Sequence, residues 1–276
     1  MLKSVASPPR YELSMSKLTI FSWGYWGWGN ATQQLVQLVD SIEATRGFNA
    51  PVFVDIRISR SVRARGFNAN AFGRLLGDAR YRHMPLLGNL AVLGRSESRI
   101  QIKDPLNARA LLELACQLTE RHARLLFFCS CEYPRLESDA NACHRVTVAR
   151  LLREGNQASL PVDIVEWPGG EPRTLEMKVS PSIAKKILRG AKSIPLGWEV
   201  PRGDFASLAW GSIIRLCWED MKFPVVVGPP KYGPQGWYLP VPWETTKKDI
   251  TEPDLVAKAR EWRREFGLEP QSAALS

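Results

Sequence analysis

The sequence lacks most of the signatures that would assign it to a familiar class of protein. It contains no run of the roughly 18 apolar residues that a membrane-spanning helix needs. Residues 1–17 contain no apolar signal-peptide segment, so we expect a cytoplasmic protein that does not bind a membrane. The patterns GxxxxGK[ST], GxGxxG and HExxH are also absent, which argues against nucleotide triphosphatases, dinucleotide-dependent dehydrogenases and zincin proteases.

Acidic residues are too few to balance the basic ones. The 276 residues include 37 Lys and Arg against 28 Asp and Glu, which leaves a net charge of +9. Such an excess favours a polyanionic partner, and we expect nucleic acid, DNA more than RNA. A phosphorylated small molecule, or a basic surface without a ligand, is the alternative. Five cysteines in a reducing cytoplasm are packing residues, metal ligands or reactive groups rather than disulfides. The oligomeric state is left unknown.

Apolar runs of strand length alternate with helical patterns through the first 167 residues. The expected strands are 18–22, 51–57, 124–130 and 160–167. The expected helices are 31–47, 68–76, 104–123 and 143–155, with Asn30 and Asn68 as N-caps of the first two. This order predicts an α/β fold over 17–167, a Rossmann-like domain with a largely parallel sheet and flanking helices.

Proline and glycine divide the remainder of the chain into short runs. WPGGEPR, residues 167–173, marks the change, and we expect a smaller β-rich domain over 168–276 that ends in a helix. Residues 1–16 are expected to be a disordered tail. Ligands of open α/β sheets bind at the carboxyl ends of the strands. Here those ends are Ser22–Trp23, Asp55–Arg57 and Cys129–Glu132, and we expect all three to face one crevice.

An aromatic, glycine-rich loop, SWGYWGWGN, follows the first strand at residues 22–30. Flat rings on such a loop can stack on a base or a sugar, whereas a lid packed over the core is the alternative. We expect Trp26 and Trp28 to be the exposed pair, and Asn30 to lie with them in the ligand site.

The run FVDIRISRSVRARGFN, residues 53–68, ends a buried strand with a carboxylate and a guanidinium. Asp55 and Arg57 alternate with apolar neighbours and therefore lie on one side of the strand. An internal ion pair would explain the two alone. Arg60, Arg63 and Arg65 follow without an acidic residue between them, and a groove that binds phosphates explains this excess better.

The segment CSCEYPRLESDANACHR, residues 129–145, is the densest cluster of reactive side chains. Cys129, Cys131 and Cys143 could together bind zinc, but neither C-x-C nor an adjacent Cys-His pair is a usual spacing. Cys129 and Arg135 form the C-x5-R pattern of cysteine phosphatases and rhodaneses. That loop needs small residues around its anion, whereas Glu132 and a proline lie inside this one.

A third interpretation places His144 and Arg145 in the first turn of a helix, aimed into the crevice beside Asp55 and Glu132. His144 would then orient a ligand or move a proton, and Arg145 would hold an anionic oxygen. The alternative is a packed Cys-His pair that caps the helix. We favour this third interpretation and expect no metal and no cofactor.

Five segments together resemble the family known as domain of unknown function 488. They are FVDIR (53–57), GFN (66–68), YRHMPLLG (81–88), LLFFCSCE (125–132) and CHR (143–145). The resemblance covers about residues 18–160 and implies a Rossmann-like domain, without an established reaction. It implies a site built from Asp55, Arg57, Asn68, Cys143, His144 and Arg145. We expect Tyr81 to join the same crevice. The longer cysteine loop and the tryptophan-rich loop depart from the family pattern.

Three functions fit these residues. The first is an enzyme of the DNA glycosylase type, a hydrolase that cleaves the N-glycosidic bond of a modified base. Its reaction needs a carboxylate, an aromatic slot and cations for the phosphates, which Asp55 or Glu132, the tryptophan loop and the arginine run would supply. The others are a non-catalytic binder of modified or single-stranded nucleic acid and a cysteine-dependent small-molecule enzyme. We favour the first, because a pure phosphate binder gains nothing from a buried carboxylate.

Overall fold

The computed structural model describes residues 17–94, 100–136, 142–156, 161–242 and 252–268, so the expected tail over 1–16 lies outside it. Its first half is built on a five-stranded, all-parallel sheet in the order β3-β2-β4-β1-β5. The strands are β1 (Leu18–Gly24), β2 (Asn49–Asp55), β3 (Tyr81–His83), β4 (Ala123–Cys129) and β5 (Val162–Glu166). The predicted α/β fold with a parallel sheet is confirmed.

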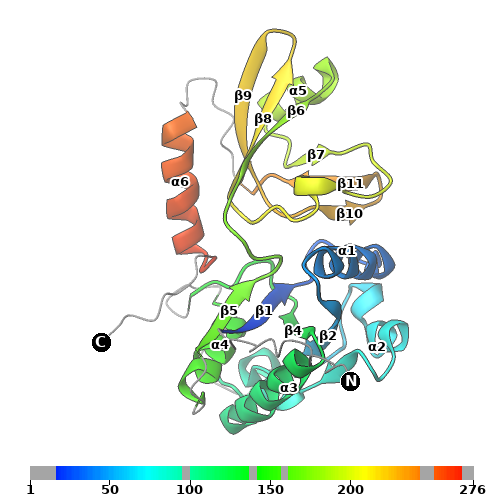
Figure 1. Cartoon of the computed structure of the whole chain (residues 1–276), viewed down its shortest axis with the longest axis vertical. Helices are drawn as coiled ribbons and strands as arrows, with labels where there is room; N and C mark the ends of the chain where they lie inside the picture. Colours follow the sequence, from blue (N-terminus) through cyan, green and yellow to red (C-terminus); the bar gives the residue numbers. More distant parts are fainter. Residues whose placement is uncertain (1–16, 95–99, 137–141, 157–160, 243–251, 269–276) are drawn as a thin grey trace, which may run out of the picture.

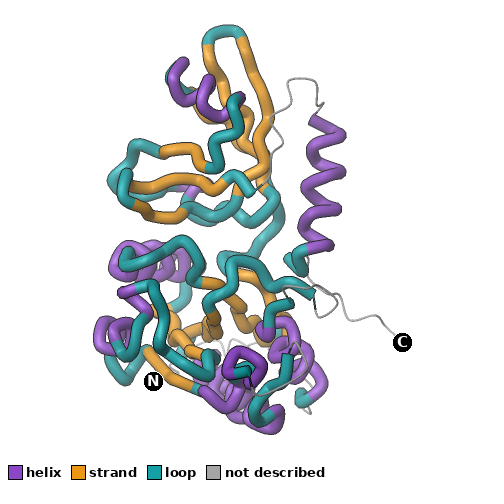
Figure 2. Tube along the Cα trace, turned by 180° about the vertical axis from the view of Figure 1, so that it is seen from behind, coloured by secondary structure: helices purple, strands orange, loops and turns teal. Residues whose placement is uncertain are grey.

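Helices cover both faces of this sheet (Figures 1 and 2). They are α1 (Thr32–Thr45), α2 (Ala71–Leu76), α3 (Ala108–Glu120) and α4 (His144–Glu154), with 3₁₀ turns at Arg65–Phe67, Pro85–Leu87, Leu90–Leu93 and Pro105–Asn107. Alternate residues of each strand face opposite ways, so Phe21 and Trp23 of β1 pack toward α1. Leu18 and Ile20 pack toward α3 and α4 on the other face. Buried strands of this kind need apolar side chains on both faces, which explains their near-continuous apolar runs.

Two small sheets and two helices make up the second half. One sheet has the order β6-β8-β9 and the other β10-β11-β7. The elements are β6 (Thr174–Lys178), α5 (Pro181–Leu188), β7 (Ser193–Pro195), a 3₁₀ turn (Gly203–Phe205), β8 (Ser212–Trp218), β9 (Met221–Val227), β10 (Lys231–Gly233), β11 (Gly236–Pro240) and α6 (Glu252–Glu265). Figure 1 shows α6 running along the β8–β9 ribbon, which it contacts through Leu255 and Ala259.

The two halves share one apolar core. A single cluster of buried side chains continues from Trp23 and Trp28, through α1, to Trp237 and Leu239 of β11. The rings of Trp28 and Trp237 meet edge to face, with their centroids 6.1 Å apart. The β10-β11-β7 sheet therefore lies directly over α1 and the loop that follows β1, as Figure 1 shows.

Helix starts in the structure differ from two expectations. Ala31, rather than Asn30, precedes α1, and Asn70, rather than Asn68, precedes α2; neither N-cap residue makes a side-chain capping bond. The Asn68 side chain instead accepts a hydrogen bond from the Val62 amide, at 3.1 Å, and so stabilises the arginine-rich loop. Among the described residues, no helix is long and apolar enough to cross a membrane.

Trp28→Ala should lower the free energy of unfolding by about 3–5 kcal/mol, because it removes a large buried ring from the contact with Trp237. Trp26→Ala is the matched control. Its ring is 61% exposed, so its loss should change stability by less than about 0.5 kcal/mol. Urea denaturation of both variants measures the difference. Equal stabilities would contradict the shared core.

Candidate functional site

The carboxyl ends of β1, β2 and β4 lie side by side at one edge of the sheet, where β5 joins them. Parallel neighbours place their ends together, as the sequence analysis expects. Elements of the second half cover this edge. The side chains there form three groups: a buried carboxylate–arginine group at the end of β2, a pocket between the two halves, and a set of cysteines at the end of β4.

Asp55 and Arg57 form a fully buried ion pair. The Arg57 Nε donates to Asp55 Oδ1 at 2.8 Å, and the Tyr81 hydroxyl donates to Oδ2 at 2.8 Å. Arg57 also donates to the Tyr25 hydroxyl at 3.2 Å and to the Phe67 carbonyl at 3.1 Å. Burial, with the charge of Asp55, raises the pKa of Tyr81. The carboxylate thus has its partners inside the protein and has no exposed surface.

The arginine loop beyond this pair reaches the surface. Arg60 donates to the side chain of Asn70 at 2.9 Å, whereas Arg63 and Arg65 are exposed and form no ion pair with any described residue. The Gly66 amide donates to the Gly29 carbonyl at 3.3 Å, so the arginine loop lies against the end of the aromatic loop. Two uncompensated cations therefore stand at the rim of the sheet edge.

The aromatic loop has one exposed tryptophan rather than two. Trp26 is exposed, as expected, but the expected exposure of Trp28 is wrong: its ring is only 2% exposed. The second half supplies Trp237 as a cover, which the sequence of the loop itself does not reveal. Tyr25 is also buried, stacked on Phe67 at 4.2 Å, and Asn30 is exposed.

A narrow pocket lies between the two halves, at the ends of β1, β4 and β5. Its lining includes Trp23, Trp28, Glu132, Trp167, Trp210 and Lys231. The Lys231 ammonium donates to Glu132 Oε1 at 3.1 Å and to the Trp26 carbonyl at 3.1 Å, and lies 5.3 Å from the Trp210 ring centre. Burial lowers the pKa of Lys231, although the nearby Glu132 opposes this shift. Glu132 is partly exposed and Lys231 is buried, so this carboxylate, unlike that of Asp55, reaches the surface.

Two further features lie around this pocket: the indole N–H of Trp167, and a tight turn of the aromatic loop over Lys231. The indole Nε1 of Trp167 is buried and has no hydrogen-bond partner among the residues that the structure describes. Gly27 has a positive φ of 86°, and a Cβ there would lie 3.3 Å from the Lys231 Nζ. Glycine therefore allows the aromatic loop to turn tightly over Lys231.

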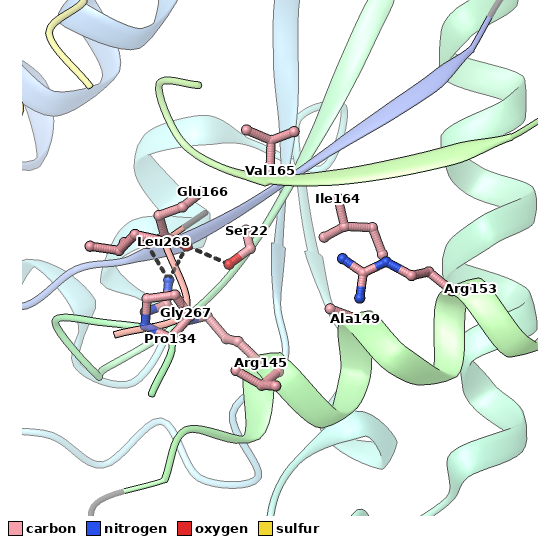
Figure 3. A pocket seen from close by; sticks show the side chains of 11 residues that line it. Ser22, Pro134, Arg145, Ala149, Arg153, Ile164, Val165, Glu166, Gly267 and Leu268 are labelled. Atoms are coloured by element: carbon pink, nitrogen blue, oxygen red, sulfur yellow. Dashed lines mark hydrogen bonds and ion pairs between the residues drawn. The ribbon is translucent and has the colours of Figure 1, made fainter. Parts of the chain in front are cut away.

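Arg145 is fully buried and pairs with Glu166 (Figure 3). Its Nη1 donates to Glu166 Oε1 at 2.7 Å, its Nη2 donates to the Cys131 carbonyl at 3.3 Å, and the Ser22 hydroxyl donates to the other side of the same carboxylate. Burial raises the pKa of Glu166, and Arg145 opposes that shift. The oxygens that Arg145 holds in this structure belong to Glu166, and its expected contact with a ligand oxygen stays a prediction.

His144 begins α4, as expected, and is buried. Within the described part of the chain, its Nε2 has no hydrogen-bond partner. Burial lowers the pKa of this imidazole, and the neutral form is favoured. The ring therefore has the properties of a neutral packed residue with one nitrogen unsatisfied.

Three of the five cysteines meet beside Arg145. The Sγ atoms of Cys129, Cys131 and Cys143 lie within 4.8 Å of one another, and the Arg145 Nε lies 3.4 Å from the Cys143 Sγ. Burial raises the pKa of the Cys129 thiol well above its ordinary value, which disfavours it as a nucleophile. The C-x5-R interpretation gains no support, since the Arg135 guanidinium lies 4.3 Å from the ring centre of Phe266.

No protein-family model, curated protein or solved structure matched this chain. The resemblance to domain of unknown function 488 therefore stays a prediction, and the site rests on its own geometry.

Lys231 and Glu166 are the residues that the sequence analysis missed. Glu166 ends an apolar strand just as Asp55 does, so the rule that selected Asp55 would also have selected it. Lys231 is a single charged residue that directly follows the uncharged run VVVGPP, which is the one local signal for it. Its partner Glu132 lies 99 residues earlier, and no local pattern links the two.

Asp55→Asn should lower the free energy of unfolding by about 3–5 kcal/mol, because Arg57 would remain buried without a counter-charge. Asp163→Asn, on β5, is the matched control. It breaks a partly exposed pair with Lys17, worth about 1 kcal/mol or less. Chemical denaturation compares the two. A stable Asp55→Asn protein would instead favour a direct role of Asp55 in chemistry.

Proposed function

We propose that the protein hydrolyses the N-glycosidic bond of a modified base in DNA, with Glu132 as the reacting carboxylate. The observation that carries this proposal is the Glu132–Lys231 pair, 3.1 Å apart, in a pocket walled by tryptophans at the carboxyl edge of a parallel sheet. Glu132 combines partial exposure with a fixed cation, whereas Asp55 is enclosed. A cytoplasmic location belongs to the same proposal, supported by five cysteines that are all free thiols.

The chemistry of this reaction fits a carboxylate in such surroundings. A water molecule attacks the anomeric carbon, the bond from carbon to base nitrogen breaks, and the base leaves with the electron pair. Glu132 takes the proton from the attacking water and faces the positive charge that develops on the sugar. The hydrogen bond from Lys231 fixes the orientation of the carboxylate.

The surroundings of the pocket supply the remaining parts. The Trp26 ring is exposed, and its backbone carbonyl accepts a hydrogen bond from Lys231, so the aromatic loop is tied to the partner of Glu132. An exposed ring can stack on an extruded or single-stranded base. Arg63 and Arg65 are the uncompensated cations that would contact the flanking phosphates.

Glu132→Gln should slow base release by about 10²–10⁴-fold, because the amide cannot take the proton from water. The affinity for DNA should be kept or rise, because the substitution removes a negative charge from a surface that binds phosphates. The assay incubates the protein with single- and double-stranded oligonucleotides that carry deaminated, alkylated or oxidised bases, and detects abasic sites by alkaline cleavage. Glu120→Gln, an exposed acid on α3, is the control. Equal rates for Glu132→Gln and the unmodified protein would refute the assignment; binding without base release would favour the non-catalytic binder.

Arg63→Ala and Arg65→Ala should each weaken DNA binding and reduce the slope of log affinity against log salt by about 0.7–0.9. Arg109→Ala, an exposed arginine on α3, should leave the slope unchanged. Trp26→Ala should weaken binding by about 1–3 kcal/mol. Fluorescence anisotropy over a salt series measures all four variants. An unchanged slope in the double Arg63, Arg65 variant would exclude this loop as the phosphate contact.

A further inference from the structure

We propose that Cys129, Cys131 and Cys143 form a zinc-binding site. The site lies outside the proposed reaction centre, and the inference does not depend on the proposed function. Three converging thiols are the observation behind it. Among the described residues, they are the one group of three or more potential metal ligands whose donor atoms all lie within 4.8 Å of one another.

The spacing of the sulfur atoms fits a single ion. A zinc–sulfur bond is about 2.3 Å long, so two thiolates on a tetrahedral ion lie about 3.8 Å apart. The Sγ atoms of Cys129 and Cys143 are 3.5 Å apart, and no pair among the three exceeds 4.8 Å. An ion among them thus requires small side-chain adjustments and no movement of the backbone.

The backbone around the three cysteines is held in place by rigid elements. Cys129 is the last residue of β4, and Cys143 precedes the first turn of α4. The Cys131 carbonyl presses against Gly24 of β1 so closely that a Cβ on Gly24 would lie 1.8 Å from the carbonyl oxygen. The Cys143 amide donates to the Arg135 carbonyl at 3.0 Å. The spacing of the ligands is therefore built into the fold.

Hydrogen-bond donors point at two of the sulfur atoms, as they do around metal-bound thiolates. The Cys131 amide donates to the Cys129 Sγ at 3.4 Å, and the Arg145 Nε donates to the Cys143 Sγ at 3.4 Å. Three thiolates and a divalent ion carry one net negative charge, and a guanidinium in contact with one sulfur stabilises it.

Zinc fits this set of ligands better than harder ions. Thiolates bind zinc and other soft ions strongly, while magnesium and calcium prefer oxygen. Three protein ligands leave one position of a tetrahedral ion for a solvent molecule, and Cys131 is the partly exposed member of the group. The spacing of these cysteines in the sequence is unusual for a zinc site, but the fold brings the three residues together.

Metal analysis of the full chain, purified under reducing conditions, tests the proposal. We expect about one zinc ion per chain, and, after exchange with cobalt(II), thiolate-to-cobalt charge transfer together with intense visible bands of a tetrahedral site. Cys129→Ser, Cys131→Ser and Cys143→Ser should each lower zinc affinity by at least about 10-fold. Cys116→Ser and Cys217→Ser, which alter the other two cysteines, should leave it unchanged.

A thiol-protection measurement covers variants that fail to fold. In the unmodified protein, bound zinc should shield the partly exposed Cys131 from alkylation, and a chelator should expose it, whereas Cys129 and Cys143 are buried in either case; peptide mass mapping identifies the labelled position. Failure of the reduced, folded chain to bind zinc or cobalt would overturn the proposal. So would zinc binding that survives all three serine substitutions, or a Cys129–Cys143 disulfide that persists under reducing conditions in place of metal.

Discussion

A guanidinium group that is wholly removed from water must be surrounded by acceptors, and Arg145 organises the edge of the sheet for this reason. Its nitrogens reach Glu166 at the end of β5, the Cys131 carbonyl after β4, and the Cys143 sulfur at the start of α4. Ser22 of β1 completes the shell around the carboxylate. Three neighbouring strands and a helix are thereby fixed at one point, because removal of Glu166 would leave a buried charge without a counter-charge, and removal of another partner would leave a buried hydrogen-bonding group unpaired.

A second buried pair, Asp55 with Arg57, does the same at the end of β2. At this edge of the sheet, Glu132 differs from the two enclosed carboxylates because it is partly exposed, and its ion pair with Lys231 joins the two halves of the chain. The arrangement separates roles that look alike in the sequence. Asp55 and Glu166 end their strands in buried pairs with arginines, whereas Glu132 follows the end of β4 and pairs with a lysine from the second half.

The sequence predicts the elements that depend on local pattern. The run PVFVDIR is a buried strand because both of its faces are apolar, and CHRVTVARLLREG is a helix that begins at His144, as expected. The burial of Trp28 and Arg145 is harder to predict, because their surroundings come from distant parts of the chain. Trp28 is covered by Trp237, and Arg145 is enclosed by Glu166 and the cysteines, and neither neighbourhood leaves a trace in nearby residues. Burial by residues far away in the sequence is therefore what the local pattern does not predict.

The shared core affects how a ligand can reach the sheet edge. Since apolar side chains continue from Trp23 and Trp28 to Trp237 and Leu239, a hinge-like separation of the two halves would bring several tryptophan and leucine side chains into water at once. Such an opening is costly, so the halves should unfold together as one cooperative unit in calorimetry. A chain cut after residue 167 would expose an apolar surface that promotes aggregation.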